Sequence, residues 1–222
     1  MDRHFQHELE SLKTMLIKMG SVVEENLSHA LQALLDQNEE LAKLVLENEE
    51  RINALELEID NAIIDLLALQ QPVASDLRFI IAAQKINNDL ERIGDHAVNI
   101  AQSDISLIKI KPIESLLELP KMAVTTKLML RNALDSFILM DSKMAQKVLV
   151  SDDQIDELNR NMTTEVINLL KADKRTIECG LELIRVSRNL ERVADITTNI
   201  AEEVIFHTEA RIVKHHAEAL KN

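Results

Sequence analysis

The stretch of sequence that decides the fold occurs twice, 100 positions apart. Residues 86–101 read INNDLERIGDHAVNIA, and residues 186–201 read VSRNLERVADITTNIA. Seven of these sixteen positions are identical, including the Leu-Glu-Arg triplets at 90–92 and 190–192. A self-similarity of this length predicts that one structural unit is built twice along the chain.

The repeat extends upstream, with a small change of offset. Residues 30–67 align with residues 133–170 at an offset of 103, so three residues are inserted between the two aligned blocks of the second copy. Pro72 lies at the corresponding place in the first copy, and residues 171–175 lie there in the second. Because insertions are tolerated in loops, we expect a loop at this position in both copies.

Apolar residues recur in both copies with the period of an α-helix. From Leu41 to Leu69 they alternate steps of four and three, and residues 144–169 repeat this seam. The expected helices span residues 9–35, 41–69, 75–101, 119–140, 144–169 and 176–216.

Polar residues at the predicted helix ends mark where each helix starts. Asp36-Gln37-Asn38 and Asp141-Ser142 can cap the second helices, and Ser75 and Thr176 can cap the third. Residues 104–118 are expected to connect the copies, with an extended part at 108–111.

Short polar loops make consecutive helices antiparallel neighbours. The prediction is therefore an all-α fold of two tandem three-helix bundles, residues 1–107 and 108–222, rather than a continuous coiled-coil rod.

Composition narrows the class of protein. The net charge of −13, with no cluster of Lys or Arg, argues against a nucleic-acid partner. No apolar run approaches the ~20 residues of a membrane span, and the first residues lack a signal-peptide core. The single Cys179 fits a reducing compartment. These features predict a cytoplasmic protein.

The repeated segment places acidic and amide side chains on one face of each third helix. At 100° per residue, Glu91, Asp95 and Asn99 stack one above another, opposite an apolar face. The second copy repeats the pattern with Glu191, Asp195 and Asn199, and Glu202 continues it. We call these sets the first and second acidic stripes, and we expect both to point outward.

Two interpretations of the stripes are open. One is an ordinary solvated helix face. The other is a cation site, because like charges four residues apart destabilise a helix by ~0.2–0.5 kcal/mol and here recur at matched positions.

Oxygen ligands suit iron, manganese, magnesium or calcium, with zinc as an adventitious occupant. One stripe supplies too few ligands, so a first helix must contribute: Asp135 in the second copy, Gln32 or His29 in the first. A di-iron bundle is excluded, because no Glu in the chain is followed by His three residues later.

The segments at 69–78, 89–97 and 189–195 together resemble the PhoU family. They read LQQPVASDLR, DLERIGDHA and NLERVAD, and the last two look like that family's duplicated Glu-Arg-Ile-Gly-Asp motif. The resemblance covers essentially the whole chain. It implies metal ions bound at the stripes and an acidic position at Asp135.

The resemblance also implies a function. PhoU proteins lower phosphate uptake and the phosphate-starvation response together with the phosphate ABC transporter and a membrane sensor histidine kinase. This implies a cytoplasmic, non-catalytic adaptor that meets the membrane only through its partners and is commonly a homodimer. The alternative is a metal-dependent enzyme acting on a phosphorylated substrate. Since Gln32 stands where an acidic residue is common, we expect stronger metal binding in the second copy.

Overall fold

The computed structural model describes residues 3–110 and 118–213, which form long α-helices and one short 3-10 helix, η1. The elements are α1 (Arg3–Asp36), α2 (Glu39–Gln70), α3 (Ala74–Ile108), α4 (Glu118–Leu139), α5 (Ser142–Ala172), η1 (Lys174–Thr176) and α6 (Ile177–Glu209). Within these described ranges, no helix is both long enough and apolar enough to cross a membrane.

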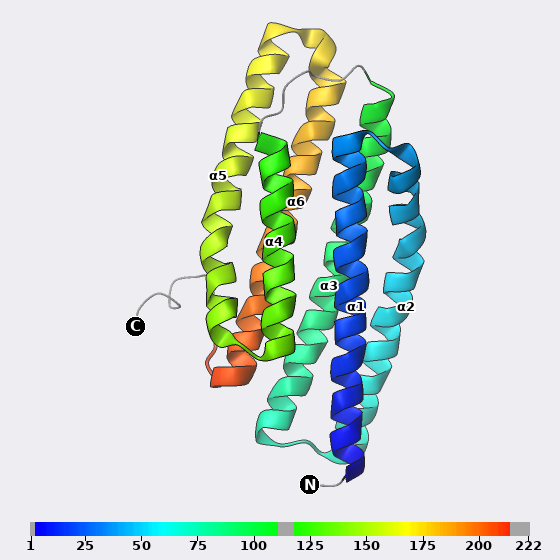
Figure 1. Cartoon of the computed structure of the whole chain (residues 1–222), viewed down its shortest axis with the longest axis vertical. Coiled ribbons are helices and arrows are strands. Elements are labelled where there is room, and N and C mark those ends of the chain that lie inside the picture. Colours follow the sequence, from blue (N-terminus) through cyan, green and yellow to red (C-terminus); the bar gives the residue numbers. More distant parts are fainter. Residues whose placement is uncertain (1–2, 111–117, 214–222) are drawn as a thin grey trace.

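The six α-helices form the two predicted bundles. Helices α1, α2 and α3 pack on one another, as do α4, α5 and α6. The bundles meet where α3 packs on α6 and α1 on α4, so that α2 and α5 lie at the outer edges (Figure 1). One continuous apolar core runs through both bundles.

The first helix of each copy ends in the same way. Gln37 after α1 and Met140 after α4 adopt left-handed φ values of 53° and 52°. The next residues, Asn38 and Asp141, donate their backbone N–H to carbonyls five residues back, which completes a Schellman motif. Their side chains then accept backbone hydrogen bonds of the following helix, as predicted. The repeat therefore extends to the turn geometry.

Of the predicted caps of the third helices, Ser75 is wrong, whereas Thr176 holds the N-cap position of α6 without a side-chain hydrogen bond to that helix. Helix α3 starts one residue before Ser75, and its cap residue, Val73, has no side-chain acceptor. Thr176 does precede α6, but its hydroxyl donates to the Asp173 carbonyl at 2.6 Å instead of capping the helix. Residues 71–73 connect α2 to α3, and Asp173 with η1 connects α5 to α6, which confirms the predicted loop in both copies.

The predicted end of α3 is also wrong. The helix continues to Ile108, so residues 104–108 belong to it and Ile108 is not extended. Lys109 and Ile110 form a turn after it, and Lys111 lies outside the described residues. At the other terminus α6 ends at Glu209, and residues 214–216 of the predicted helix are likewise outside. Ser103 and Asp104 misled the sequence reasoning, because both are polar but buried.

Asp104 is a buried acid that the fold tolerates at a cost. Only 1% of the residue is exposed, one carboxyl oxygen has no hydrogen-bond partner among the described residues, and burial raises its pKa to about 6. The equivalent residue of the second copy is Val204, which is buried too.

Replacing Asp104 with asparagine should therefore stabilise the protein at neutral pH. The carboxyl pKa is higher in the folded chain than in the unfolded chain, so wild-type stability falls as pH rises from about 4 to about 6. The Asp104→Asn variant lacks this loss. Urea unfolding should show a gain of about 1–3 kcal/mol at pH 8 and little difference at pH 4. An equal gain in stability at both pH values would show that the gain does not come from the ionisation of Asp104.

The predicted seam of α2 is buried along most of its length. Val45, Ile52 and Ile59 are at most 1% exposed. Leu69, the last predicted member, is 71% exposed and is a wrong assignment. It belongs to the final turn of α2, in which the next residue, Gln70, still donates to Glu8 of α1 at 2.9 Å.

Candidate functional site

The first acidic stripe lies where the projection of α3 placed it. Leu90 and Ile93 are fully buried, whereas Asp95 and Asn99 are exposed and Glu91 is half-buried between these two faces. The stripe therefore looks outward from the core of its own bundle.

Acidic side chains of α2 complete the surroundings of this stripe. The pKa of Glu91 is raised by partial burial, then by the nearby charges of Asp95, Glu56 and Glu49, while Arg92 opposes this. The pKa of Glu56 is also raised, first by burial and then by Asp60 and Asp95. Two acids of α3 and two of α2 thus share one negative field.

The second helix, rather than the first, supplies these additional acids. Gln32 instead approaches Asp36 of its own helix at 3.4 Å. Glu49 and Glu56 were not predicted, because the apolar seam of α2 gives no sign of them. They are seven residues apart, or about two helical turns, so a projection of α2 would have placed them on one face.

The second stripe has a different electrostatic environment. Its four members on α6, Glu191, Asp195, Asn199 and Glu202, are all half-buried. Burial and then Asp195 raise the pKa of Glu191, and Asp156 of α5 adds to this, while Arg192 and Arg188 oppose it. Arg192 also approaches Asp195 at 3.6 Å. Guanidinium groups therefore offset part of the negative charge in this copy.

Asp135 is not among the charged groups that act on Glu191. It is half-exposed on α4, and its ion-pair partner is Arg131, at 4.0 Å on the same helix. The acid that α5 provides, Asp156, thus corresponds to the acids that α2 provides in the first copy.

Polar pairs connect the two third helices next to the stripes. Asn199 hydrogen-bonds the buried Asp89, and Lys85 donates to Glu203 at 2.6 Å. A third contact joins the His96 ring to the Asn189 amide oxygen at 2.8 Å. The residue numbers of the partners increase along α3 as they decrease along α6, as expected for antiparallel helices. Asn199, a predicted ligand, therefore already has a partner between the bundles.

The stripes fit a cation by chemistry but do not gather a complete set of ligands. Carboxylate oxygens under mutual repulsion are suitable donors for a hard cation. Within residues 3–110 and 118–213, however, no group of three or more His, Cys, Asp or Glu side chains is arranged to hold a metal ion. Side-chain rearrangement or a second protein surface would have to supply further ligands.

Comparison with known proteins then decides the family. The model of the PhoU domain matches the chain twice, at residues 16–103 and 119–204. This chain belongs to the PhoU family. Each PhoU domain match contains one acidic stripe, so the repeat recognised in the sequence is the family's own unit.

Relatives of this PhoU-family chain match along nearly its whole length. A phosphate-specific transport system accessory protein PhoU homolog of Aquifex aeolicus is 39% identical over 208 residues, which cover 94% of each chain. The PhoU accessory protein of Escherichia coli is 32% identical over 95% of this chain and 88% of its own length.

A solved structure agrees with the fold. The crystal structure of PhoU from Pseudomonas aeruginosa superposes with a TM-score of 0.90 at 35% identity, covering 93% of this chain and all of that one. The all-α architecture of two repeated three-helix bundles is thus the architecture of the family.

Proposed function

We propose that this chain is a non-catalytic adaptor that lowers phosphate uptake and damps phosphate-starvation signalling. One observation carries the proposal: both PhoU domains match, and the relatives are named accessory proteins of the phosphate-specific transport system. The proposed partners are the transporter ATPase and the sensor histidine kinase. The chain would act in the cytoplasm as a homodimer and reach the membrane only through these partners.

The shape of the molecule suits such a role. Long helices packed around one core present rigid, extended side faces, and the acidic stripes lie outside that core. Groups held on rigid helices form a defined docking surface without first having to be ordered. The stripes are therefore well placed to meet another protein.

A bound cation would change the charge of this docking surface. Glu91, Asp95 and Glu56 would hold it in the first copy, and Glu191, Asp195 and Asp156 in the second. When bound, the cation would neutralise the repulsion between these carboxylates. Burial and the neighbouring acids raise the pKa values of Glu91, Glu56 and Glu191. Cation affinity should therefore fall as pH is lowered and these glutamates become protonated.

The two copies should differ in cation affinity, in the order opposite to that expected from Gln32. In the first stripe two acids of α2, Glu56 and Glu49, act on Glu91 against one arginine, Arg92. In the second stripe one acid of α5, Asp156, acts on Glu191 against two arginines, Arg188 and Arg192. Calorimetric titration with Mn²⁺ should show a larger loss of affinity for Asp95→Ala than for Asp195→Ala. Asp65→Ala, an exposed acid on α2, serves as control. Equal losses, or a larger loss from Asp195→Ala, would contradict this order.

Direct binding tests the adaptor role. The purified chain should retain the transporter ATPase and the sensor kinase of its own organism in a pull-down assay, and retain them less well after chelation of metal. If neither protein is retained under any metal condition, the proposed role is wrong. Release of phosphate from simple phosphoesters by the purified chain would instead support the enzymatic alternative.

A further inference from the structure

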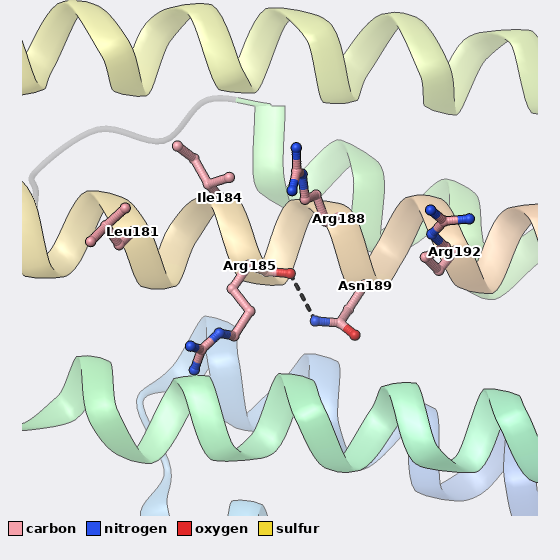
Figure 2. A pocket seen from close by; sticks show the side chains of 6 residues that line it. All are labelled: Leu181, Ile184, Arg185, Arg188, Asn189 and Arg192. Atoms are coloured by element: carbon pink, nitrogen blue, oxygen red, sulfur yellow. Dashed lines mark hydrogen bonds between the residues drawn. The ribbon is translucent and has the colours of Figure 1, made fainter.

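A second surface, which adjoins the second acidic stripe on α6, carries a concentration of positive charge. It lies on α6 around a shallow hollow of about 350 Å³, shown in Figure 2. We call it the arginine face, and its members are Leu181, Ile184, Arg185, Arg188, Asn189 and Arg192. Three of these six residues are arginine, in a chain of net charge −13.

The three guanidinium groups are available to a ligand. Arg185 pairs with Glu182 at 3.3 Å and Arg192 with Asp195 at 3.6 Å, but both arginine side chains remain more than 60% exposed. Exposed ion pairs of this kind contribute only about 0–1 kcal/mol and exchange readily. Arg188 is exposed too, and its charge acts on Glu191 of the second acidic stripe.

Packing between the two copies does not account for these arginines. At the equivalent positions the first copy has Lys85, Asn88 and Arg92. Lys85 crosses to Glu203 of the other bundle, and Arg92 pairs with the buried Asp89. Lys85 therefore links the two bundles, whereas the ion pairs of Arg185 and Arg192 stay within α6.

The geometry of the arginine face selects the kind of ligand. The Arg185 side chain extends toward α3, and the Arg188 side chain leaves the opposite side of α6 (Figure 2). A single small oxyanion cannot meet groups that diverge in this way. A segment with several carboxylates can, and the hollow also offers it apolar contacts, since Leu181 is 58% exposed and Ile184 lies one turn away. Arginine beside apolar side chains is typical of residues that dominate binding energy.

We propose that the arginine face docks an acidic, amphipathic helical segment of a partner protein. Carboxylates of that segment would pair with Arg185, Arg188 and Arg192, while its apolar side would cover Leu181 and Ile184. The inference deepens the proposed function, because the segment would belong to a protein that the chain regulates. The overall negative charge of the chain opposes such a ligand, but at physiological salt charges more than about 8 Å apart are largely screened.

A synthetic peptide tests the proposal without knowledge of the natural partner. The probe is a fluorescent helical peptide of about 20 residues with Glu on one face and Leu on the other. The fluorescence anisotropy of the peptide should rise when it binds the full chain, and its affinity should fall as salt is added. The affinity of the double variant Arg185→Glu/Arg188→Glu for the peptide should be lower by a factor of about ten or more. The control Arg131→Glu, which reverses an equally exposed arginine on α4, should bind like wild type.

The outcomes separate this inference from the proposed function. Equal binding by the double variant and wild type, an equal loss in Arg131→Glu, or equal binding of a peptide with Gln at every Glu position would each overturn it. Circular dichroism and the milder Arg188→Gln variant establish that any loss comes from charge and not from misfolding. The peptide assay does not involve phosphate regulation, so regulation that fails while the peptide still binds would overturn only the proposed function.

Discussion

Cells whose only PhoU-family protein carries alanine at both Asp95 and Asp195 are expected to keep taking up phosphate rapidly when phosphate is plentiful. The two aspartates occupy the same position of the repeated motif, one on α3 and one on α6, and both belong to the acidic stripes. Removing them takes one carboxylate from each proposed cation and docking surface. We expect uptake several-fold above that of wild type, measured with radiolabelled phosphate, and each single variant should have a smaller effect.

The double variant should remain folded, which makes the result interpretable. Alanine favours helix formation, and its introduction removes the like-charge pairs that Asp95 and Asp195 make with the glutamates four residues earlier. A matched control replaces Asp65 and Asp153, which are exposed acids on α2 and α5, and should behave like wild type. Normal repression in the double variant would show that the stripes do not regulate uptake.

Replacing Leu90 or Leu190 with alanine should cause the largest losses of stability. Both leucines are fully buried at equivalent positions of α3 and α6, within the core that joins the two bundles. Each substitution leaves a cavity, and changes of this kind cost about 2–5 kcal/mol. Urea unfolding monitored by circular dichroism should show losses of similar size for the two variants, because the repeat gives them similar surroundings.

Leu57→Ala is the control for this pair of substitutions. Leu57 is 62% exposed on α2, so its truncation should change the free energy of unfolding by no more than about 0.5 kcal/mol. If only one of the two buried substitutions were destabilising, the bundles would not be equivalent in packing. If Leu57→Ala cost as much as either, the predicted division between core and surface would be wrong.

Sequence reasoning predicted the repeated parts of the fold well, for identifiable reasons. An apolar seam such as Val45, Ile52 and Ile59 must be buried on one side of a helix. Its period therefore predicts both that the segment is a helix and which face of that helix points to the core. Asn38 and Asp141 were predictable as caps, since each follows an apolar helix and precedes another. Two copies of each signal made both assignments more secure than either copy alone.

The parts that were not predictable depend on contacts between distant segments. Asp104 lies in a buried turn of α3 although its chemistry is typical of a loop. Likewise, the pairing of Asn199 with Asp89 arises only because α3 and α6 pack antiparallel between the bundles. Similarly, Glu56 reaches the first stripe through the packing of α2 on α3. A single helix projection contains none of this information.

The most direct test of the adaptor role is phosphate transport in a reconstituted system. The phosphate transporter of the same organism would be placed in proteoliposomes with ATP, and the purified chain added from outside, where the ATPase is exposed. In this orientation the transporter moves phosphate from the vesicle lumen to the outside, so the vesicles are loaded with phosphate. We predict that wild-type chain lowers the rate of ATP-driven phosphate release and that the Asp95→Ala/Asp195→Ala chain does so less. A release rate that stays unchanged while the chain binds the transporter would contradict the account.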